Sequence, residues 1–304
     1  MIRIQSGLQQ NGIPLIRMES DYVLADIAPD VGGKIVRLIN KPLDYDFLWK
    51  NPTLRLEKHP PGSEYDPRFY GGIDELLPND IPETIEGLDW PDHGELWTTA
   101  LQPEIAGNHL ILRAELPLSG LHYIRQMAVR EDSPWIDLDY SITNVSASVR
   151  PFLWKLHAAL SVQAGDRIDC PARRARVVDP AWSRFHDLEP FPWPLIEEQL
   201  AHVIPEKNGT VDFFYLYEMQ EGRMAWRRLA EHLEFAYHFD TNIFPYAWLF
   251  ASYGGFDDHY TVILEPCTAM PISVRDAAAQ GQCTVLQPGE SLHTCVSIYA
   301  GPLR

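Results

Sequence analysis

The strict alternation of apolar and polar residues over Trp135–Thr143 constrains the fold more than any other feature of this chain. A period of two is the signature of a β-strand with one buried and one exposed face. Comparable runs surround it, separated by turn residues, and they read HLILRAELP at 109–117, HYIRQMAVRED at 122–132 and PFLWKLHAALSV at 151–162. The periodicity and the spacing of the turns predict an antiparallel meander within an all-β sandwich.

The rest of the chain predicts further strands of the same kind. Tyr22–Ile27 and Lys34–Asn40 flank a glycine turn, and we expect them to be antiparallel neighbours. Ala225–Leu233 has good helix formers, but the β context on both sides favours strands there. Further strands are expected at 213–217, 223–227, 233–239, 245–252, 260–265 and 293–300. Because no linker, repeat or shift in composition divides the chain, we expect one domain over residues 1–304.

The proline-rich stretch Asp179–Asn208 interrupts this rhythm. Its prolines and aromatic rings predict an ordered excursion from the sheet, with a short helix at Leu195–His202. Such an excursion is either a lid beside a functional site or a structural cover over the core.

Charge and cysteine content narrow the class of protein. The chain has 25 basic and 42 acidic residues, a net charge of −17 at pH 7, spread without blocks. Nucleic acids and anionic membranes require clustered Lys and Arg, so neither is an expected partner. No apolar run approaches the length of a membrane span, and the first residues lack the apolar core of a signal peptide, so we expect a cytoplasmic protein. The four cysteines show no CxxC spacing and are expected to be reduced, although a Cys283–Cys295 bridge stays open.

The connection Arg68–Trp97 has the character of a binding-site wall. Its glycines and prolines break any helix, and it is too polar to be a buried strand. Its hydrophobic and aromatic residues give it a packing surface, so disorder is not expected, and long ordered connections are usually functional. The chain also has nine Trp, 13 Tyr and 12 Phe, whose ring faces suit stacking against sugar rings.

Three residues are candidates for chemistry, each with an ordinary alternative. His93 lies in the loop sequence PDHG and is either functional or simply held by its neighbours. His157 shares one face of its strand with Lys155, and the alternative is a plain polar-face histidine. Glu265 ends an apolar strand before Pro266, where partial desolvation would raise its basicity as a general base requires; the alternative is a strand end facing water. No metal-binding, serine-nucleophile or nucleotide-binding motif occurs, so no metal or organic cofactor is predicted.

Several stretches together resemble the galactose mutarotase-like (aldose 1-epimerase) family. They are VGGKIVRLINK at 31–41, PDHGELW at 91–97, FLWKLHAAL at 152–160, LEP at 264–266 and LQPGESLHTCVSIYAG at 286–301. The likeness in order and character runs over nearly the whole chain, and PDHGELW and LEP are its most specific parts. The resemblance implies an antiparallel β-supersandwich with few short helices and a sugar site on its concave face.

The resemblance also implies roles for individual residues. His93 would position the sugar, His157 would be the general acid and Glu265 the general base, while Arg68 would hold sugar hydroxyls. The family's sugar-contacting aspartate has no secure counterpart, and Asp240 and Asp212 both stay open. Ala158-Ala159 follows His157 where the family has a proline and an aromatic residue, which marks a divergent branch.

The reaction implied is interconversion of the α and β anomers of a neutral monosaccharide. A base takes the proton of the anomeric hydroxyl, an acid protonates the ring oxygen, and the roles reverse on ring closure. His157 must then be protonated, which we expect nearby carboxylates to favour. Two alternatives are a non-catalytic carbohydrate-binding protein of the same fold and a sugar lyase or hydrolase on a related sandwich. A sugar phosphate is less favoured, because no cluster of Arg and Lys lies beside the candidate residues.

Overall fold

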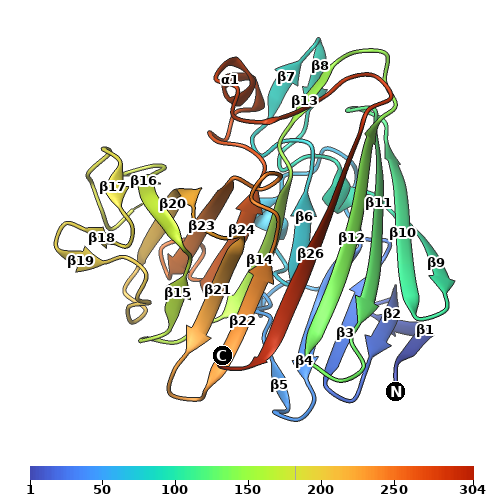
Figure 1. Ribbon diagram of the computed structural model, residues 1–304, viewed down its shortest axis with the longest axis horizontal. Helices are drawn as coiled ribbons and strands as arrows, with labels where there is room; N and C mark the ends of the chain where they lie inside the picture. Colours follow the sequence, from blue (N-terminus) through green and yellow to red (C-terminus); the bar gives the residue numbers. More distant parts are fainter. Residues whose placement is uncertain (182) are drawn as a thin grey trace.

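The computed structural model describes residues 1–181 and 183–304, and it consists mainly of two antiparallel sheets (Figure 1). The larger sheet has 12 strands. In spatial order these are β1 (Arg3–Gln10), β2 (Ile13–Glu19), β3 (Val23–Ala28), β4 (Lys34–Asn40), β6 (Ile73–Leu76), β14 (Lys155–Ser161), β24 (Tyr260–Cys267), β23 (Tyr246–Tyr253), β20 (Thr210–Met219), β16 (Ala172–Val177) and β17 (Phe191–Pro192), with β5 (Tyr45–Asp46) paired to β4.

The smaller sheet has eight strands and packs against the larger one. Its order is β15 (Arg167–Asp169), β21 (Arg223–Arg228), β22 (Leu233–His238), β26 (Ser291–Pro302), β12 (Trp135–Asn144), β11 (Leu121–Val129), β10 (His109–Leu116) and β9 (Gln102–Ala106). Short pairs and helices complete the described chain: β7 (Glu83–Ile85) with β8 (Leu88–Trp90), β13 (Arg150–Phe152) with β25 (Thr284–Leu286), β18 (Leu195–Ile196) with β19 (Gln199–Leu200), the helix α1 (Val274–Ala279), and the 3-10 turns η1 (Asp66–Arg68) and η2 (Leu96–Thr98). The predicted antiparallel sandwich with few short helices is confirmed.

The sandwich core lies between the two sheets. The alternating apolar residues of β12 from Ile136 to Ile142 are buried, and so is every second residue of its neighbour β11. They meet Leu156, Ala158 and Leu264 from the facing side of β14 and β24 in one hydrophobic cluster. Each large apolar side chain buried in this way contributes about 1.5–3 kcal/mol, so this contact is the main stabilising term of the fold.

The predicted meander is correct for β10, β11 and β12, which pair in sequence order, but wrong for the run at 151–162. That run forms β14, which lies in the other sheet between β6 and β24. Residues 155–160 are all buried, because β14 is covered on both faces. A strand of this kind loses the alternation that identifies its sheet partner.

A buried ion pair joins the sheets. Glu75 of β6 accepts four hydrogen bonds. Three come from the smaller sheet: from Arg125 Nη1 at 2.6 Å, Tyr123 Oη at 2.8 Å and Tyr140 Oη at 2.8 Å. The fourth comes from Trp154 Nε1, directly before β14, at 3.1 Å. The expectation that Arg68–Trp97 is too polar for a buried strand is therefore wrong over Ile73–Leu76, where Asp74 and Glu75 are both buried. Buried carboxylates are tolerated when their oxygens are paired, as here.

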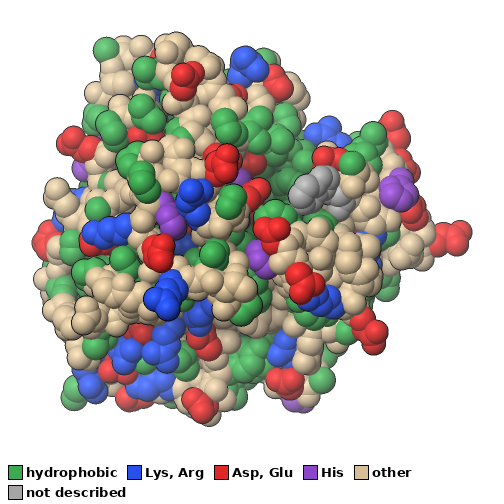
Figure 2. Space-filling view, turned by 180° about the vertical axis from the view of Figure 1, so that it is seen from behind, with side chains coloured by type: hydrophobic (Ala, Val, Ile, Leu, Met, Phe, Trp, Pro, Cys, Tyr) green, Lys and Arg blue, Asp and Glu red, His purple; other side chains and the backbone are tan. Residues whose placement is uncertain are grey.

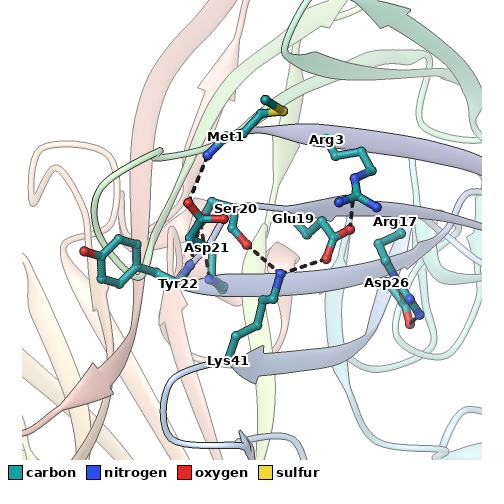
Figure 3. A network of polar contacts seen from close by, with 10 residues as sticks. Met1, Arg3, Arg17, Glu19, Ser20, Asp21, Tyr22, Asp26 and Lys41 are labelled. Carbon is teal, nitrogen blue, oxygen red and sulfur yellow. Dashed lines mark hydrogen bonds and ion pairs between the residues drawn. The ribbon is translucent and has the colours of Figure 1, made fainter.

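The N-terminal edge of the larger sheet has a network of more exposed ion pairs (Figure 3). The contacts are Met1 N to Asp21 Oδ2 at 3.1 Å, Lys41 Nζ to Glu19 Oε2 at 3.0 Å and to Ser20 O at 2.9 Å, Arg3 Nε to Glu19 Oε1 at 3.4 Å, and Arg17 Nε to Asp26 Oδ1 at 2.7 Å. They tie β1, β2 and β3 to the start of the β4–β5 turn. The exposed pairs of Met1 and Arg3 contribute little stability. The Arg17–Asp26 pair is different, because Asp26 is buried and the pair is screened less by solvent.

The excursion at 179–208 is ordered where it is described; residue 182 lies outside the described residues. The helix predicted at Leu195–His202 is wrong: β18 and β19 form a hairpin there. Glu197 and Glu198 take φ values of +49° and +61°, the left-handed pair that a two-residue hairpin turn requires. Phe185, Phe191 and Ile196 are buried in the main core, so the excursion covers the sandwich.

The other sequence predictions have clear outcomes. The strands expected at 213–217, 223–227 and 233–239 are β20, β21 and β22, and β3 pairs with β4 as predicted. All four cysteines are free, so the Cys283–Cys295 bridge is absent, and Cys295 is exposed. Within residues 1–181 and 183–304, no helix is long and apolar enough to cross a membrane. The organisation as one domain stays a prediction.

We predict that Glu75→Gln and Arg125→Met each lower the free energy of unfolding by about 3–5 kcal/mol, because each leaves a buried charge without its partner. Urea unfolding followed by tryptophan fluorescence measures the change. Glu104→Gln is the matched control: its pair with Arg113 has the same 2.6 Å separation, but it is exposed and should be worth about 1 kcal/mol or less. Equal losses in the buried and exposed pairs would contradict the account.

Candidate functional site

A cavity of about 210 Å³ opens on the face of the larger sheet that is turned away from the smaller sheet. Its floor comes from β14 and β24, whose inner-facing residues belong to the core while Lys155, His157, Ile263 and Glu265 face outward. Figure 2 shows this side of the molecule, where hydrophobic side chains gather at a hollow that has acidic and histidine side chains near its edge. The remaining lining residues are Tyr65, Asp66, Phe69, Asp80, Ile81, His93, Phe213, Phe250, Phe256 and Ile272.

His157 and Glu265 lie side by side on the floor. β14 pairs with β24 so that Lys155 faces Cys267 and Ala158 faces Leu264. This register places His157 opposite Glu265, and directly opposed residues of antiparallel strands have Cβ atoms about 4.5–5.5 Å apart. Both side chains line the cavity while being only 4% and 1% exposed. The structure therefore brings the predicted acid and base together.

Glu265 has the environment expected of a general base. Its strand continues to Cys267, and its side chain is buried, so the alternative of a strand end facing water is wrong. Burial raises the pKa of the Glu265 carboxyl above its usual value, while the ammonium of Lys155, 2.7 Å from Oε2, opposes that rise. A desolvated carboxylate is a stronger proton acceptor than one in water.

Lys155 is a member of the site that sequence reasoning missed. Its Nζ lies 2.5 Å from Asp80 Oδ1 and 2.7 Å from Glu265 Oε2, and 4.7 Å from the ring centroid of Trp248. Burial opposes the charged form, but Asp80 and Glu265 outweigh it and raise the pKa of Lys155 above its ordinary value. The available signal was the shared strand face, since Lys155 lies two residues before His157.

His157 differs from expectation in its charge. Burial and then the positive charge of Lys155 hold the pKa of His157 well below 6.5, so the imidazole is neutral at pH 7. The prediction that nearby carboxylates favour its protonation is wrong, because the charged neighbours that dominate are cations. Its Nδ1 lies 3.4 Å from Tyr65 Oη, and that hydroxyl also donates to Asp74 Oδ2 at 2.7 Å.

His93 is both held by its neighbours and part of the cavity wall. Its Nδ1 is 2.8 Å from Asp92 Oδ1, and its ring stacks on Tyr65 with centroids 4.4 Å apart. Burial alone would lower the pKa of His93, but Asp80 and the hydrogen bond to Asp92 outweigh it and raise the pKa above 6.5. The two candidate histidines therefore have opposite shifts within one cavity.

The backbone around His93 explains the PDHG sequence. His93 and Gly94 have φ values of +57° and +78°, and a Cβ on Gly94 would lie far inside contact distance of the Leu77 carbonyl oxygen. Only glycine fits such a left-handed, tightly packed position. Glu95 then anchors the loop by accepting hydrogen bonds from Leu118 N at 2.9 Å and Ser119 N at 2.8 Å.

The structure does not bring the other predicted residues to the cavity. Arg68 lies in η1, donates from Nη1 to Glu64 O at 2.9 Å and lines a separate surface depression. Asp240 is exposed and accepts a hydrogen bond from Asn242 N at 2.8 Å. Asp212 is buried in an ion pair with Arg184 at 2.7 Å. The polar residues found in their place are Tyr65, Asp66, Asp80 and Lys155, which come from the loop before β6, the turn after it and β14.

Nothing in the described residues forms a group of three or more His, Cys, Asp or Glu placed to hold a metal ion. Within its described part, the excursion at 179–208 supplies none of the lining residues of the cavity and packs on the core, as the alternative of a structural cover expects. The cavity is thus built from the larger sheet and the connections around β6.

No protein-family model matches the sequence. Solved structures do match the whole architecture. A galactose mutarotase-like protein from Clostridium acetobutylicum superposes with a TM-score of 0.73 at 14% identity, covering 99% of both chains. The fold is that of the galactose mutarotase-like sandwiches.

Two further solved structures also match over more than nine-tenths of this chain. A galactose mutarotase-like protein from Lactobacillus casei matches with a TM-score of 0.67 at 14% identity, over 94% of this chain and 99% of that one. A candidate aldose 1-epimerase from Escherichia coli K12 matches with a TM-score of 0.72 at 16% identity, over 96% of this chain and all of that one. At such identities the galactose mutarotase-like likeness establishes the fold alone.

We predict that Gly94→Ala destabilises the protein more than Gly87→Ala, although both glycines have a φ of +78°. Each alanine carries the left-handed cost of about 1–2 kcal/mol, but only position 94 adds a clash, since a Cβ at position 87 meets open space. Urea unfolding compares the two, and NMR titration of His93 reports whether its raised pKa survives. Equal destabilisation with an unchanged His93 titration would contradict the packing described for the loop.

Proposed function

We propose that this protein is an aldose 1-epimerase that interconverts the α and β anomers of a neutral monosaccharide. The observation that carries the proposal is the pairing of His157 and Glu265, two proton-transfer groups with perturbed pKa values, on the floor of one cavity. Perturbed groups that share a cavity are the usual signature of a functional site. The fold of the structural neighbours agrees with this assignment.

Glu265 supplies the base. Its carboxylate takes the proton of the anomeric hydroxyl, the bond between C1 and the ring oxygen breaks, and the ring oxygen receives a proton from the acid. Rotation about the C1–C2 bond and closure with the roles reversed give the other anomer. Positioned acid and base groups each contribute about 10²–10⁴-fold in rate, and this sequence of steps needs no redox change.

His157 is the proposed acid, and His93 is the second histidine of the cavity. The adjacent position of His157 beside Glu265 suits transfer at two atoms of one sugar ring, because the anomeric hydroxyl and the ring oxygen are bonded to the same carbon. The low pKa of His157 makes its protonated form scarce at pH 7 but a strong proton donor when present. The pH dependence of the reaction therefore distinguishes the two histidines.

The character of the cavity favours a neutral sugar. Its one lysine, Lys155, is already paired with Asp80 and Glu265, so an anionic sugar would find no unpaired lysine or arginine among the described lining residues. Phe69, Phe213 and Phe250 present ring surface to the same space. Aromatic rings pack well against the apolar faces of sugars, which supports binding of a single ring.

A non-catalytic sugar-binding protein is the second candidate function. It is favoured by the neutral state of His157 at pH 7 and by the distance of Arg68 and Asp240 from the cavity. Such a protein would bind aldoses saturably and leave their rate of mutarotation unchanged.

We predict that Glu265→Gln and His157→Asn each slow the mutarotation of an accepted neutral aldose by about 10²–10⁴-fold, because each removes one proton-transfer group. Polarimetry of freshly dissolved α-anomers gives the rate, and calorimetric titration shows whether the sugar still binds. Glu104→Gln and His109→Asn, exposed on the edge of the smaller sheet, are the matched controls and should keep the wild-type rate. Full activity in both cavity variants would refute the assignment.

We predict that kcat/KM for mutarotation declines as pH rises through a value below 6.5. The acid must be protonated, so activity is lost above its pKa, and the pKa of free His157 lies below 6.5. Initial rates between about pH 4 and pH 9 measure this limb, corrected for the spontaneous reaction. A decline that begins above pH 6.5 and moves in His93→Asn would transfer the role of acid to His93, whose pKa is raised.

A further inference from the structure

A row of alternating charges runs across the cavity from the PDHG loop to β24. Asp92 Oδ1 lies 2.8 Å from His93 Nδ1, and His93 Nε2 lies 3.8 Å from Asp80 Oδ1. The same Asp80 oxygen lies 2.5 Å from Lys155 Nζ, which is 2.7 Å from Glu265 Oε2. Lys155 is thus the cation between the proposed base and the wall that carries His93.

Burying the ammonium of Lys155 carries a desolvation cost that lowers the stability of the fold. Lys155 is 3% exposed, and lysine is almost never fully buried unless it is paired. Apolar residues can often replace a buried ion pair without loss of stability. Stability alone therefore does not explain why Lys155 is paired with Asp80 and Glu265 in the cavity wall. Because Lys155, Asp80 and Glu265 all line the cavity, that explanation concerns the ligand site.

We propose that Lys155 is a positioning residue of this site: anchored by Asp80, its ammonium holds Glu265 as an ionised carboxylate in the orientation needed to accept a proton from the substrate. This role rests on the proposed function. Without the ammonium, a carboxylate as deeply buried as Glu265 would retain its proton to higher pH and could not act as a base there. Asp80 shares the ammonium and so limits how strongly it stabilises the Glu265 carboxylate.

The charges around the cavity give each substitution a definite sign. Lys155 lowers the pKa of Glu265 and of His157, whereas Asp80 raises the pKa of Glu265 and of His93. Removing Lys155 should therefore raise the pKa of Glu265, and removing Asp80 should lower it. Further titratable or charged groups around these residues are Asp66 in η1, Asp92 in the PDHG loop, Tyr65, Cys267 at the end of β24, and Lys34 on β4.

The test uses four variants of the full chain. Lys155→Met removes the ammonium, Lys155→Arg keeps a positive charge, and Asp80→Asn removes the competing anion. Arg228→Met is the matched control, because Arg228 is also a buried cation, 2.9 Å from Asp166, and lies outside the cavity. The Glu265 carboxyl is followed by ¹³C NMR titration of glutamate-labelled protein and assigned by the resonance missing in Glu265→Gln. The pH profile of mutarotation is measured on the same proteins.

The expected result is a shift of opposite sign in the two neighbours. Lys155→Met raises the Glu265 titration midpoint by about one pH unit or more, Asp80→Asn lowers it, and Lys155→Arg and Arg228→Met leave it near the wild-type value. The acid limb of kcat/KM moves with the midpoint in each variant. If Lys155→Met does not fold, the downward shift in Asp80→Asn decides the question.

Two outcomes would overturn the inference while leaving the proposed function in place. One is an active enzyme whose Glu265 midpoint stays within experimental error in both Lys155→Met and Asp80→Asn. The other is a midpoint that shifts as expected while the acid limb of activity does not move. The protein would then still be a mutarotase, but Glu265 would not be its base and Lys155 would have no base to support. A wild-type protein that accelerates no aldose would instead defeat the proposed function, and with it the role of Lys155 as support for a base.

Discussion

The two adjacent carboxylates of β6, Asp74 and Glu75, link the sandwich core to the cavity wall. Glu75 points into the sandwich and collects donors from Arg125, Tyr123, Tyr140 and Trp154, which join the two sheets. Asp74 points to the opposite face and accepts hydrogen bonds from Lys34 Nζ and Tyr65 Oη, both at 2.7 Å. Since Tyr65 also stacks on His93 and approaches His157, one short strand connects the packing of the core to the wall of the cavity. Because successive side chains of a strand point to opposite faces of the sheet, Glu75 can contact the core while Asp74 contacts the cavity wall.

The cavity places groups of unlike proton affinity close together. Burial makes Glu265 more basic and His157 more acidic, and Lys155 moderates the first effect while adding to the second. Environments that push titratable groups in different directions are what acid–base chemistry at a single site requires. In the proposed function the ligand is a neutral sugar ring, because aromatic side chains line the cavity and Lys155 is already paired with Asp80 and Glu265. In the proposed function, the residues that line the cavity would contact the sugar, and Arg68 and Asp240 are not among them.

More of the fold than of the candidate site could be predicted from the sequence. Alternation identified β10, β11 and β12, because each of these strands has one face on the core and one in solvent. It predicted β14 as a strand but in the wrong sheet, because β14 is buried on both faces. It missed the hairpin of β18 and β19, whose two turn glutamates are good helix formers. His93, His157 and Glu265 were found through local sequence. The row of alternating charges could not be predicted in this way. Lys155 lies 75 residues after Asp80 and 110 residues before Glu265, and these residues come together only in the folded chain. The same omission explains the wrong expectation for His157, whose state is dominated by burial and by Lys155.

Exchange spectroscopy can detect catalysis of anomer exchange by the cavity. Proton NMR of an equilibrated neutral aldose resolves the two anomeric protons, and transfer of magnetisation between them reports the exchange rate at chemical equilibrium. We expect wild-type protein to increase this rate in proportion to its concentration, and Glu265→Gln at the same concentration to leave it unchanged. Saturable binding of aldoses with exchange no faster than in buffer would contradict this expectation.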